Sequence, residues 1–421
     1  MTNLTRFLSH FGGISRALSN PNYRTYWIGQ IVMVQGFWIY KIVGGWMMFE
    51  MTNSPAWLGA LGSAYLLPIF LLGPFGGAVA DRFGYRRCAL TMGGSGAFLA
   101  ILTGILAYMG LMTPVLLLAL TTIQGLLFAF EFPARQSLFP NLMRREDMPA
   151  AIAVNSTTFH SSSCTGPLIG GLLLQTNIDG IGFAANGFCM LWMMCAIYLV
   201  PKPANLGDRL AEKKASGILN DLKDGLRYTR SHVDIRLLMI LTLTASLLLR
   251  HYLDFLPGFS GIVFKQGKEG LATLTAAAGI GAMIFSTFLA VRGRTKGLTN
   301  FLFVGQTISA TALILFASTD NFMFALMALV LVGGLLNSAA VCIQSLIQHS
   351  VDDDYRARVI SINVSLAVGA PAISAPIVGW IAEYYGLQLA LSGSAALSLL
   401  ILIPAGLILR KRRKKIEAEK T

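Results

Sequence analysis

Charged side chains are scarce in this chain of 421 residues: Asp, Glu, Lys and Arg make up 13% of it, whereas hydrophobic residues make up 54%. A soluble protein of this size could not hide so much apolar surface. Many apolar runs reach the roughly 20 residues that span a bilayer, and they lack the polar face of a soluble surface helix. The composition therefore argues against a large soluble all-helical protein and predicts an all-α membrane protein with many spans.

Cysteine is also scarce, and the five cysteines are scattered, mostly within apolar runs. Their odd number and irregular spacing match neither a disulfide framework nor a metal site, so we interpret them as small packing residues. The sequence also lacks a nucleotide-binding loop and a hydrolytic constellation of side chains. We therefore expect no cofactor, no metal and no enzymatic activity. The N-terminus lacks a cleavage pattern, and the first span is expected to act as its own signal.

Acidic residues are outnumbered, with 20 Asp and Glu against 33 Lys and Arg, which gives a net charge of +13. Such a charge could indicate nucleic acid binding, but the positions of the cations argue against it. In a twelve-helix arrangement, all of them except Lys41, Arg250, Lys265 and Lys268 fall on one side. This is the positive-inside bias. It predicts that both termini are cytoplasmic and that the partners are lipids and not nucleic acid. We also expect a monomer in a bacterial inner membrane.

Twelve spans are predicted, and their approximate residues are 24–49, 55–80, 87–109, 113–138, 149–175, 181–200, 235–258, 268–291, 298–317, 321–348, 357–382 and 387–409. Between the sixth and seventh spans lies a polar stretch, 201–233. In it Ile218, Leu219, Leu222 and Leu226 fall at helical spacing, which predicts an amphipathic helix on the membrane surface. The basic tail, 411–421, is expected to be a solvated orientation signal rather than a specific lipid site.

The two halves of the chain repeat at an offset of about 209 residues. Gln136-Ser137-Leu138 returns as Gln344-Ser345-Leu346, and Gly166-Pro167 returns as Ala375-Pro376. With six spans in each half, the shared offset predicts two pseudo-symmetric six-helix bundles, 1–200 and 234–410, joined by 201–233 as a cytoplasmic linker.

The stretch Gly73–Arg87 starts in an apolar run and ends in a cluster of charge. Its pattern Gly77-x-x-x-Asp81-Arg82-x-Gly84-x-Arg86-Arg87 resembles the loop signature of the major facilitator superfamily of transporters, although Tyr85 stands where a basic residue is common. The resemblance implies a cytoplasmic loop that controls opening, with Gly77, Asp81, Arg82, Gly84 and Arg86 as gating residues. We interpret Asp81 as a latch held by the N-terminal end of a helix in the other half, starting near Arg356.

The fifth predicted span contains Gly166-Pro167-Leu168-Ile169-Gly170-Gly171. Proline removes one backbone hydrogen bond and bends a helix, while glycines let helices approach closely. The block resembles the antiporter motif of facilitator-family exporters and implies export. A packing kink without directional meaning remains the alternative. We assign Gly166, Pro167, Gly170 and Gly171 to the kink.

A narrower resemblance rests on Phe130-Glu131-Phe132-Pro133-Ala134-Arg135 and on the block Tyr23–Gln30. Both are similar to the branch of facilitators that contains enterobactin-exporter-like and macrolide-efflux-like proteins. Members of this branch commonly carry an asparagine and an arginine at the positions of His160 and Ser163. The superfamily's arginine in the fourth helix, implicated in proton coupling, is Thr121 here. The arginine of the usual coupling route is thus missing.

Titratable groups inside the predicted spans are the candidates for proton coupling: Glu131, His160 and Asp254. His160 sits in a dense polar run, 155–165, that is costly in a span unless it faces a cavity or other helices. It could bind a proton or substrate, or it could be a neutral histidine bonded to a nearby hydroxyl. Glu131 and Arg135 lie one turn apart and can pair. We favour a salt-bridge network that joins this pair to Asp81 and Arg86 at the inner gate, which makes Arg135 a gating residue.

Lys41 and Arg250 are cations deep in the first span of each half, each at a cost of about 2.5–3.5 kcal/mol. They are separated by the offset of the repeat, so pseudo-symmetry predicts that they face each other across a central cavity. We interpret them as an anion-binding pair. His251 and Asp254 could partly neutralise Arg250, and Trp38 is a candidate aromatic wall. The alternative is local pairing of Arg250 with Asp254 and snorkelling of Lys41 towards water.

Together these features predict a secondary active transporter that works by alternating access. The favoured function is proton-coupled export of an amphipathic, anionic small molecule, siderophore-like or drug-like. One alternative is an uptake permease for an organic acid, nutrient or siderophore. Another is a membrane receptor or assembly partner that transports nothing.

Overall fold

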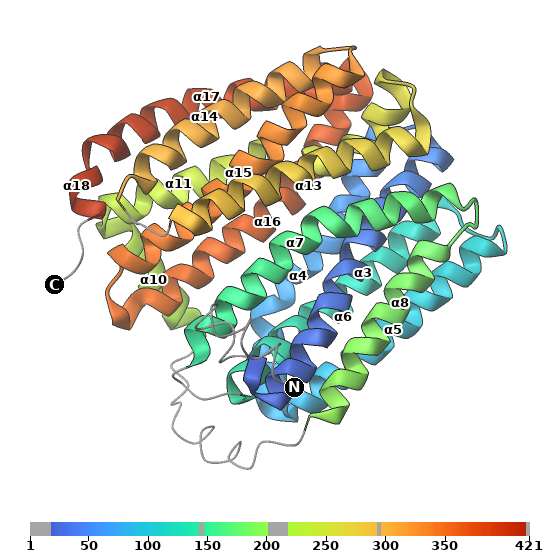
Figure 1. Cartoon of the computed structure of the whole chain (residues 1–421), viewed down its shortest axis with the longest axis horizontal. Coiled ribbons are helices and arrows are strands. Elements are labelled where there is room, and N and C mark those ends of the chain that lie inside the picture. Colours follow the sequence, from blue (N-terminus) through green and yellow to red (C-terminus); the bar gives the residue numbers. More distant parts are fainter. Residues whose placement is uncertain (1–17, 143–146, 201–217, 293–295, 418–421) are drawn as a thin grey trace, which may run out of the picture. The chain divides into compact units, whose positions relative to one another are not determined.

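A computed structural model describes residues 18–142, 147–200, 218–292 and 296–417, and these residues are helical almost throughout, with no strand among them (Figure 1). The helices of the first half are α3 (Pro21–Thr52), α4 (Pro55–Phe83), α5 (Tyr85–Tyr108), α6 (Pro114–Leu138), η2 (Phe139–Leu142), α7 (Met148–Gln175) and α8 (Ile181–Leu199). Those of the second half are α10 (Ile218–Ser231), α11 (Val233–Leu248), α12 (Tyr252–Gly258), η4 (Phe259–Val263), α13 (Gly267–Arg292), α14 (Leu298–Ser318), α15 (Phe322–Ser350), α16 (Asp353–Tyr385), α17 (Leu387–Lys411) and α18 (Arg413–Ile416).

Ten of the described helices are long and apolar enough to cross a membrane, or eleven if the bent pair at Ser231–Val233 forms one span. The predicted all-helical membrane class is therefore confirmed, and a count of twelve is not reached by this criterion. Helix α7 forms as predicted but is not among the ten, because its middle carries the polar run 155–165. The predicted span 235–258 is interrupted: α11 ends at Leu248 and α12 begins at Tyr252.

Helix starts follow local chemistry that the sequence carries. Proline opens α4 and α6, where its missing N–H removes a donor that the first turn leaves unpaired anyway. The hydroxyl of Thr113 caps α6 by accepting from the Leu116 N–H at 3.3 Å. The Asn321 side chain caps α15 in the same way at 3.0 Å. These caps place the helix boundaries within a few residues of the predicted ones.

The chain divides into two compact units. One takes the described residues up to Gly44 and those from Leu71 to helix α8; the other takes Gly45–Phe70 together with everything from α10 onward. The predicted bundles put the boundary within the 201–233 linker. The observed units differ from them in segment 45–70, which belongs to the second unit. Its residues pack against α12 and α16, as the contacts of Gly59 with Ala375 and of Gly62 with Asp254 illustrate.

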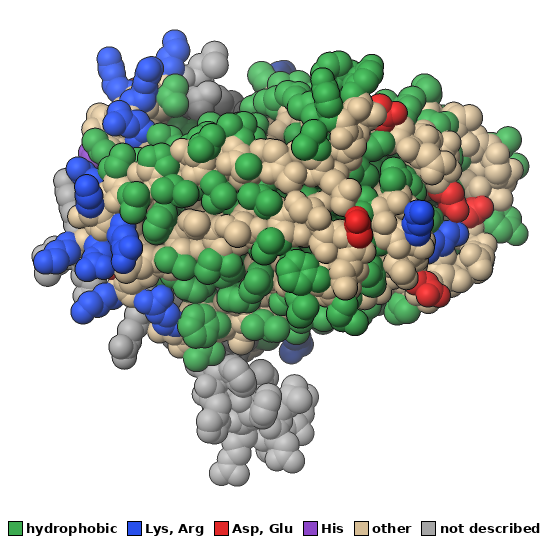
Figure 2. Space-filling model, turned by 90° about the horizontal axis from the view of Figure 1, so that it is seen from above, with side chains coloured by type: hydrophobic (Ala, Val, Ile, Leu, Met, Phe, Trp, Pro, Cys, Tyr) green, Lys and Arg blue, Asp and Glu red, His purple; other side chains and the backbone are tan. Residues whose placement is uncertain are grey.

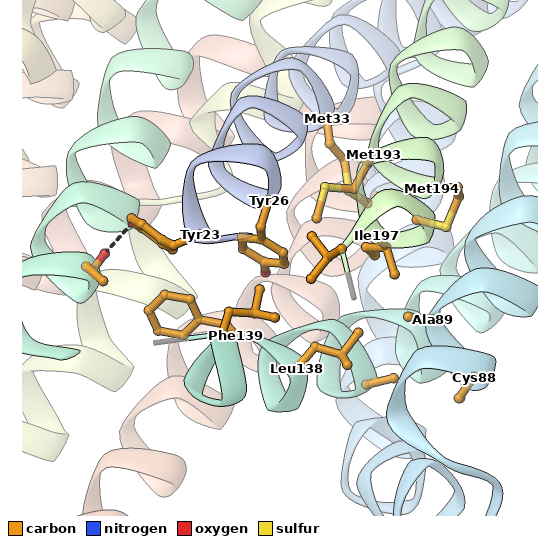
Figure 3. Packing of buried hydrophobic residues seen from close by; sticks show 14 of the residues in the cluster. Tyr23, Tyr26, Met33, Cys88, Ala89, Leu138, Phe139, Met193, Met194 and Ile197 are labelled. Atoms are coloured by element: carbon orange, nitrogen blue, oxygen red, sulfur yellow. Dashed lines mark hydrogen bonds between the residues drawn. The ribbon is translucent and has the colours of Figure 1, made fainter. Parts of the chain in front are cut away.

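The first unit has an apolar cluster at the end where α3 begins (Figure 3). Tyr23 and Tyr26 of α3 pack around Phe139. Their ring centroids lie 5.8 and 6.1 Å, respectively, from the centroid of the Phe139 ring. Met193 and Met194 of α8 close the other side of the cluster. Burial of these large side chains fixes α3 against α6 and α8.

The same packing order occurs in both units. Helix α5 packs on α6 and α8, and α14 packs on α15 and α17. In the second unit, α13 and α15 approach until a Cβ at Gly281 would lie 2.9 Å from the Cα of Val330, so glycine is required there. The repeated order agrees with the internal repeat in the sequence.

Helix α10 lies within the predicted linker and meets the helix after it at a bend of 109°. Its buried face carries Gly225, Tyr228 and Thr229, which pack on α16. Leu226, predicted on the apolar face, is 49% exposed; the side chains of Ile218, Leu219 and Leu222 are outside the described part. A helix therefore forms in the predicted segment, and its buried face packs on α16.

Candidate functional site

A ladder of polar contacts joins α3 to α7 along the first unit. Tyr23 Oη donates to the carbonyl of Ala151 at 3.1 Å, and Trp27 Nε1 donates to the hydroxyl of Thr158 at 2.9 Å. Further on, the Gln35 amide donates to Ser162 and Thr165 at 3.0 and 2.9 Å. Since the residue numbers rise together on both helices, α3 and α7 run in the same direction. Three members of the polar run, Thr158, Ser162 and Thr165, thus bond to α3.

The Gly-Pro block continues this contact without side chains. A Cβ at Gly166 would lie 2.5 Å from the Cβ of Trp38, and one at Gly170 would lie 3.3 Å from the Cβ of Ile42. Pro167 and Gly171 are buried beside them. Contacts below 3.0 Å do not occur between real carbon atoms, so Gly166 lets α7 lie directly on α3.

A buried ion pair lies at the other face of α3. Glu131 and Arg135 of α6 are 0% and 3% exposed, and Glu131 Oε1 accepts from Arg135 Nε at 2.6 Å. The Arg135 guanidinium also donates to the side-chain oxygen of Gln30, and it lies 5.6 Å from the centroid of the Phe132 ring. Among the described residues, Glu131 Oε2 has no hydrogen-bond partner. The predicted pairing of Glu131 with Arg135 is confirmed.

The network expected to join this pair to Asp81 and Arg86 is wrong in its connections. Asp81 accepts instead from the hydroxyl of Tyr85, one turn later. Arg86 Nη2 donates to the carbonyl of Tyr198 at 2.6 Å, and its guanidinium lies 5.8 Å from the Tyr198 ring. The physical reason is burial, since Glu131 and Arg135 are enclosed while Asp81 is exposed to solvent.

The loop between α4 and α5 is a single residue, Gly84. Its φ of 89° lies where side-chain-bearing residues are strained, so the turn requires glycine. Close approach in α4 occurs at Gly76, where a Cβ would lie 3.2 Å from the Cα of Phe130. A Cβ at Gly77 would meet nothing within 4 Å in the described part of the chain. Arg82 is exposed.

Arg250 occupies the break between α11 and α12. Its N–H donates to the carbonyl of Ala245 at 3.0 Å, and its side chain is half-buried. Within the described residues no carboxylate pairs with Arg250, so the predicted local pair with Asp254 does not form. Asp254 lies against α4, where a Cβ on Gly62 would be 3.1 Å from its carboxyl carbon.

His251 is 0% exposed and uses both ring nitrogens. Nδ1 lies 3.1 Å from the carbonyl of Leu247, and Nε2 lies 3.3 Å from the hydroxyl of Ser394 on α17. With its proton on Nδ1, the ring donates to the carbonyl and accepts from the hydroxyl. This arrangement fits a neutral histidine that ties α11 to α17.

The remaining candidates lie on α3 and α7. Lys41 is half-buried on α3, next to Tyr40, whose hydroxyl lies 2.9 Å from that of Thr121. Trp38 is half-buried against Phe159, and its Nε1 has no hydrogen-bond partner among the described residues. His160 lies on α7, but its side chain is outside the described part.

Sequence reasoning missed two contributors to these contacts. Gln30 completes the Arg135 site, and it belongs to the Tyr23–Gln30 block that carried the branch resemblance. Glu383 at the end of α16 accepts from the hydroxyl of Ser54 at 2.7 Å and from the Ala56 N–H at 3.3 Å. No local pattern marks Glu383, because its partners are far away in the chain.

No group of three or more metal-ligating side chains occurs among the described residues. Cys88, Cys189, Cys195 and Cys342 are free thiols; the side chain of Cys164 is outside the described part.

Comparisons with known proteins all identify transporters as the relatives of this chain. The sequence profile of the transmembrane secretion effector family matches residues 14–421. The chain is 24% identical over 384 residues to the staphyloferrin A transporter of Staphylococcus aureus, covering 91% of this chain and 95% of the relative. It is 22% identical over 352 residues to the multidrug efflux pump Tap of Mycolicibacterium fortuitum, covering 82% and 85%.

Solved structures show the same fold. A D-xylose-proton symporter superposes with a TM-score of 0.70 at 15% identity, covering 94% of this chain and 97% of that one. A bacterial homologue of the lysosomal transporter Spinster, in an inward-facing and occupied conformation, gives a TM-score of 0.70 at 12% identity, covering 94% and 98%. The chain therefore belongs to the transmembrane secretion effector family of the major facilitator superfamily, whose members are transporters and not enzymes.

Proposed function

We propose that this transporter exports an amphipathic, anionic small molecule by alternating access, in exchange for protons. The observation that carries the proposal is the break at Arg250. An interrupted span is where transporters of several folds place their substrate sites. Here the break holds a half-buried cation that has no acidic partner among the described residues. A bound anion would supply the missing charge.

Two lines of similarity support the class of substrate. One relative is described as a staphyloferrin A transporter and another as a multidrug efflux pump. A siderophore or an amphipathic drug is therefore the substrate class to test first. Lys41, Trp38 and His160 of the first unit remain candidate substrate-binding residues. His251 has a structural role at least, since both of its ring nitrogens are engaged.

Glu131 is our first candidate for proton coupling. It is fully buried, one of its oxygens pairs with Arg135, and the other has no partner in the described part. Such an oxygen can accept a proton without breaking a hydrogen bond. Asp254 and His160 are kept as further candidates.

We also propose twelve spans in two six-helix bundles, 1–200 and 234–410, with 201–233 as the linker. The two spans beyond the ten are α7 and the broken helix 233–263. The parallel course of α3 and α7 supports this, because the first and fifth spans of such an arrangement cross in the same direction. The basic residues favour an inner-membrane protein with both termini in the cytoplasm, working as a monomer.

The test is flux into inside-out vesicles, with and without a pH gradient. Three probes are compared: staphyloferrin A, an anionic amphipathic dye, and a cationic dye of similar size. We expect the anionic probes to accumulate, faster with the gradient. Arg250→Gln should weaken their apparent affinity by roughly tenfold or more, the value of a hydrogen bond to a charged group. Arg230→Gln, which removes an exposed cation on α10, is the matched control.

Three outcomes would contradict the proposal. Preference for the cationic dye would contradict the proposal that the substrate is anionic. Equal affinities in Arg250→Gln and Arg230→Gln would remove Arg250 from the site. Accumulation in right-side-out vesicles alone would make the protein an uptake permease.

A further inference from the structure

The C-terminal segment is folded rather than extended. Helix α17 ends at Lys411, the chain turns at Arg412, and the short helix α18 follows. Ile416 at its end is 2% exposed, which means that the segment packs its apolar side chain onto the second unit. The described part of the tail is thus folded, while its cations Arg410, Lys411, Arg413 and Lys414 stay exposed; its role as an orientation signal stays a prediction. Figure 1 shows α18 beside the first turns of α11 and α14.

Two polar anchors hold this fold. The Arg412 guanidinium donates to both carboxylate oxygens of Asp234, at the start of α11. These hydrogen bonds and the charge of Asp234 raise the pKa of Arg412, so it stays charged at every physiological pH. Glu417 accepts from the N–H groups of Gly297 and Thr299 at 2.7 and 2.9 Å, which caps the start of α14. The tail is therefore fixed to two helices of its own unit.

The anchored tail surrounds an open hollow of about 470 Å³. Its lining consists of Leu407, Arg410, Lys411, Arg413 and Lys414. All four cations are exposed, and the lining contains no acidic side chain. Figure 2 shows Lys and Arg side chains gathered at the left end, where Figure 1 has α18 and α10. Cations that line one hollow repel one another, so a bound anion would stabilise the arrangement.

The face of α17 that leads into the hollow is apolar. Leu400, Ile403 and Leu407 are 73%, 40% and 45% exposed, and they lie three or four residues apart. One turn after Leu407, the same face carries Arg410 and Lys411, and Lys414 of α18 lines the hollow beside them. Because α17 is long and apolar enough to cross a membrane, this face presents hydrocarbon-compatible side chains first and cations at the depth of the headgroups.

We propose that this hollow binds the phosphate headgroup of an anionic phospholipid, whose acyl chains lie along Leu400, Ile403 and Leu407. Basic pockets at the membrane edge are known to hold such headgroups. A free phosphate would satisfy the cations but would not use the apolar face. The adjoining apolar face therefore favours a lipid over a soluble anion. Bound lipid would in turn fix the end of α17 at the membrane surface.

The test uses the full-length protein in detergent, depleted of lipid and then titrated with phosphatidylglycerol or with phosphatidylcholine of the same acyl chains. Bound lipid is counted by native mass spectrometry. We expect phosphatidylglycerol to bind to the wild type. Its affinity should fall by roughly tenfold or more in the triple variant R410Q/R413Q/K414Q, since each cation near a membrane contributes appreciably to the attraction of anionic lipid. The control K223Q/R227Q/R230Q removes three exposed cations from α10 in the same unit.

Three further measurements distinguish lipid binding from the binding of other anions, and a defined site from diffuse charge. Leu407→Asn should weaken lipid binding while the four cations remain, and millimolar inorganic phosphate should not displace the lipid. Glu417→Gln keeps every cation and loosens the anchor, so it should also weaken binding. The proposal is overturned if both triple variants lose lipid equally, if phosphate displaces it, or if phosphatidylcholine binds as well. Thermal unfolding of each variant checks that the protein remains folded.

Discussion

The side chains of Glu131, Arg135 and Gln30 form the most enclosed charged group in the described part of the first unit. Taking an ion pair out of water is costly, and it is tolerated only when geometry and further hydrogen bonds compensate. Here Arg135 gains two side-chain acceptors and an aromatic ring, while Glu131 keeps one oxygen unpaired. Arg135 is thus tightly held by its partners, whereas Glu131 keeps one oxygen that can accept a proton.

Removing the acid should leave Arg135 as a buried, uncompensated charge. We expect Glu131→Ala to lower stability by about 3–5 kcal/mol, as for other broken buried pairs. Glu131→Gln retains an oxygen that Arg135 can bind and should be clearly milder. Thermal unfolding in detergent measures both, with the exposed Arg82→Ala as control. Equal stability of Glu131→Ala and the wild type would show that the pair contributes nothing.

The variant Glu131→Gln also tests proton coupling. If Glu131 carries the coupled proton, Glu131→Gln should abolish the stimulation of flux by a pH gradient while substrate exchange without a gradient persists. Full stimulation in Glu131→Gln would assign coupling to Asp254 or His160.

Asp81 is exposed and bonded to Tyr85, and its role as a latch stays a prediction. We expect Asp81→Asn to slow turnover with little change in substrate affinity, because a gate needs the charge and a binding site elsewhere does not. Tyr85→Phe keeps the carboxylate and releases it from the hydroxyl, so its turnover should match or exceed that of the wild type. Initial rates over a range of substrate concentrations separate the two parameters. A large loss of affinity at normal turnover would contradict the latch.

Helix α7 shows how a polar sequence can still be a membrane helix. Three of its hydroxyls are bonded to Trp27 and Gln35 of α3, so these groups have partners inside the protein. Beyond this ladder, Gly166 and Gly170 bring the two backbones together. The contact changes from polar to close-packed along one pair of helices, and Pro167 marks the change.

This contact should be sensitive to a single methyl group. Gly166→Ala would place a Cβ 2.5 Å from Trp38 and force α7 away from α3, at a cost of about 1–3 kcal/mol. Gly94→Ala is the matched control, because a Cβ on that helical glycine meets nothing within 4 Å. We expect the control to be neutral or slightly stabilising. Equal unfolding temperatures for the two variants would mean that α3 and α7 are not closely packed here.

Along the chain as a whole, the division into units does not follow helix boundaries. Helices α3 and α4 each contribute one part to either unit, and segment 45–70 belongs with α12 and α16. Glu383 fixes this segment by binding Ser54 and the first turn of α4. A carboxylate at that place also complements the positive end of the helix.

Loss of this cap should loosen the segment selectively. Glu383→Ala removes a capping contribution of about 1 kcal/mol, so amide hydrogen exchange in residues 54–62 should accelerate about fivefold. Glu269→Ala, an exposed acid at the start of α13, is the control and should leave this exchange unchanged. Unchanged exchange in Glu383→Ala would show that the interior contacts of Gly59 and Gly62 suffice to hold the segment.

The helices themselves followed from local information, because a bilayer leaves a spanning chain little choice but to bond its own backbone. Apolar runs, opening prolines and the single glycine of the α4–α5 turn are all readable in the sequence, and so is the pairing of Glu131 with Arg135, one turn apart. The loop signature and the Gly-Pro block were sufficient to indicate the superfamily.

Contacts between distant residues could not be read in this way. Gln30 at Arg135, Tyr198 at Arg86, Glu383 at Ser54 and Asp234 at Arg412 each join groups whose separation in sequence is large. The break at Arg250 was likewise hidden, since neither glycine nor proline stands at residues 249–251 to mark the end of a helix. Periodicity reports which face of a helix is apolar, whereas the partner of each polar group depends on which helices meet, and that is settled by packing in three dimensions.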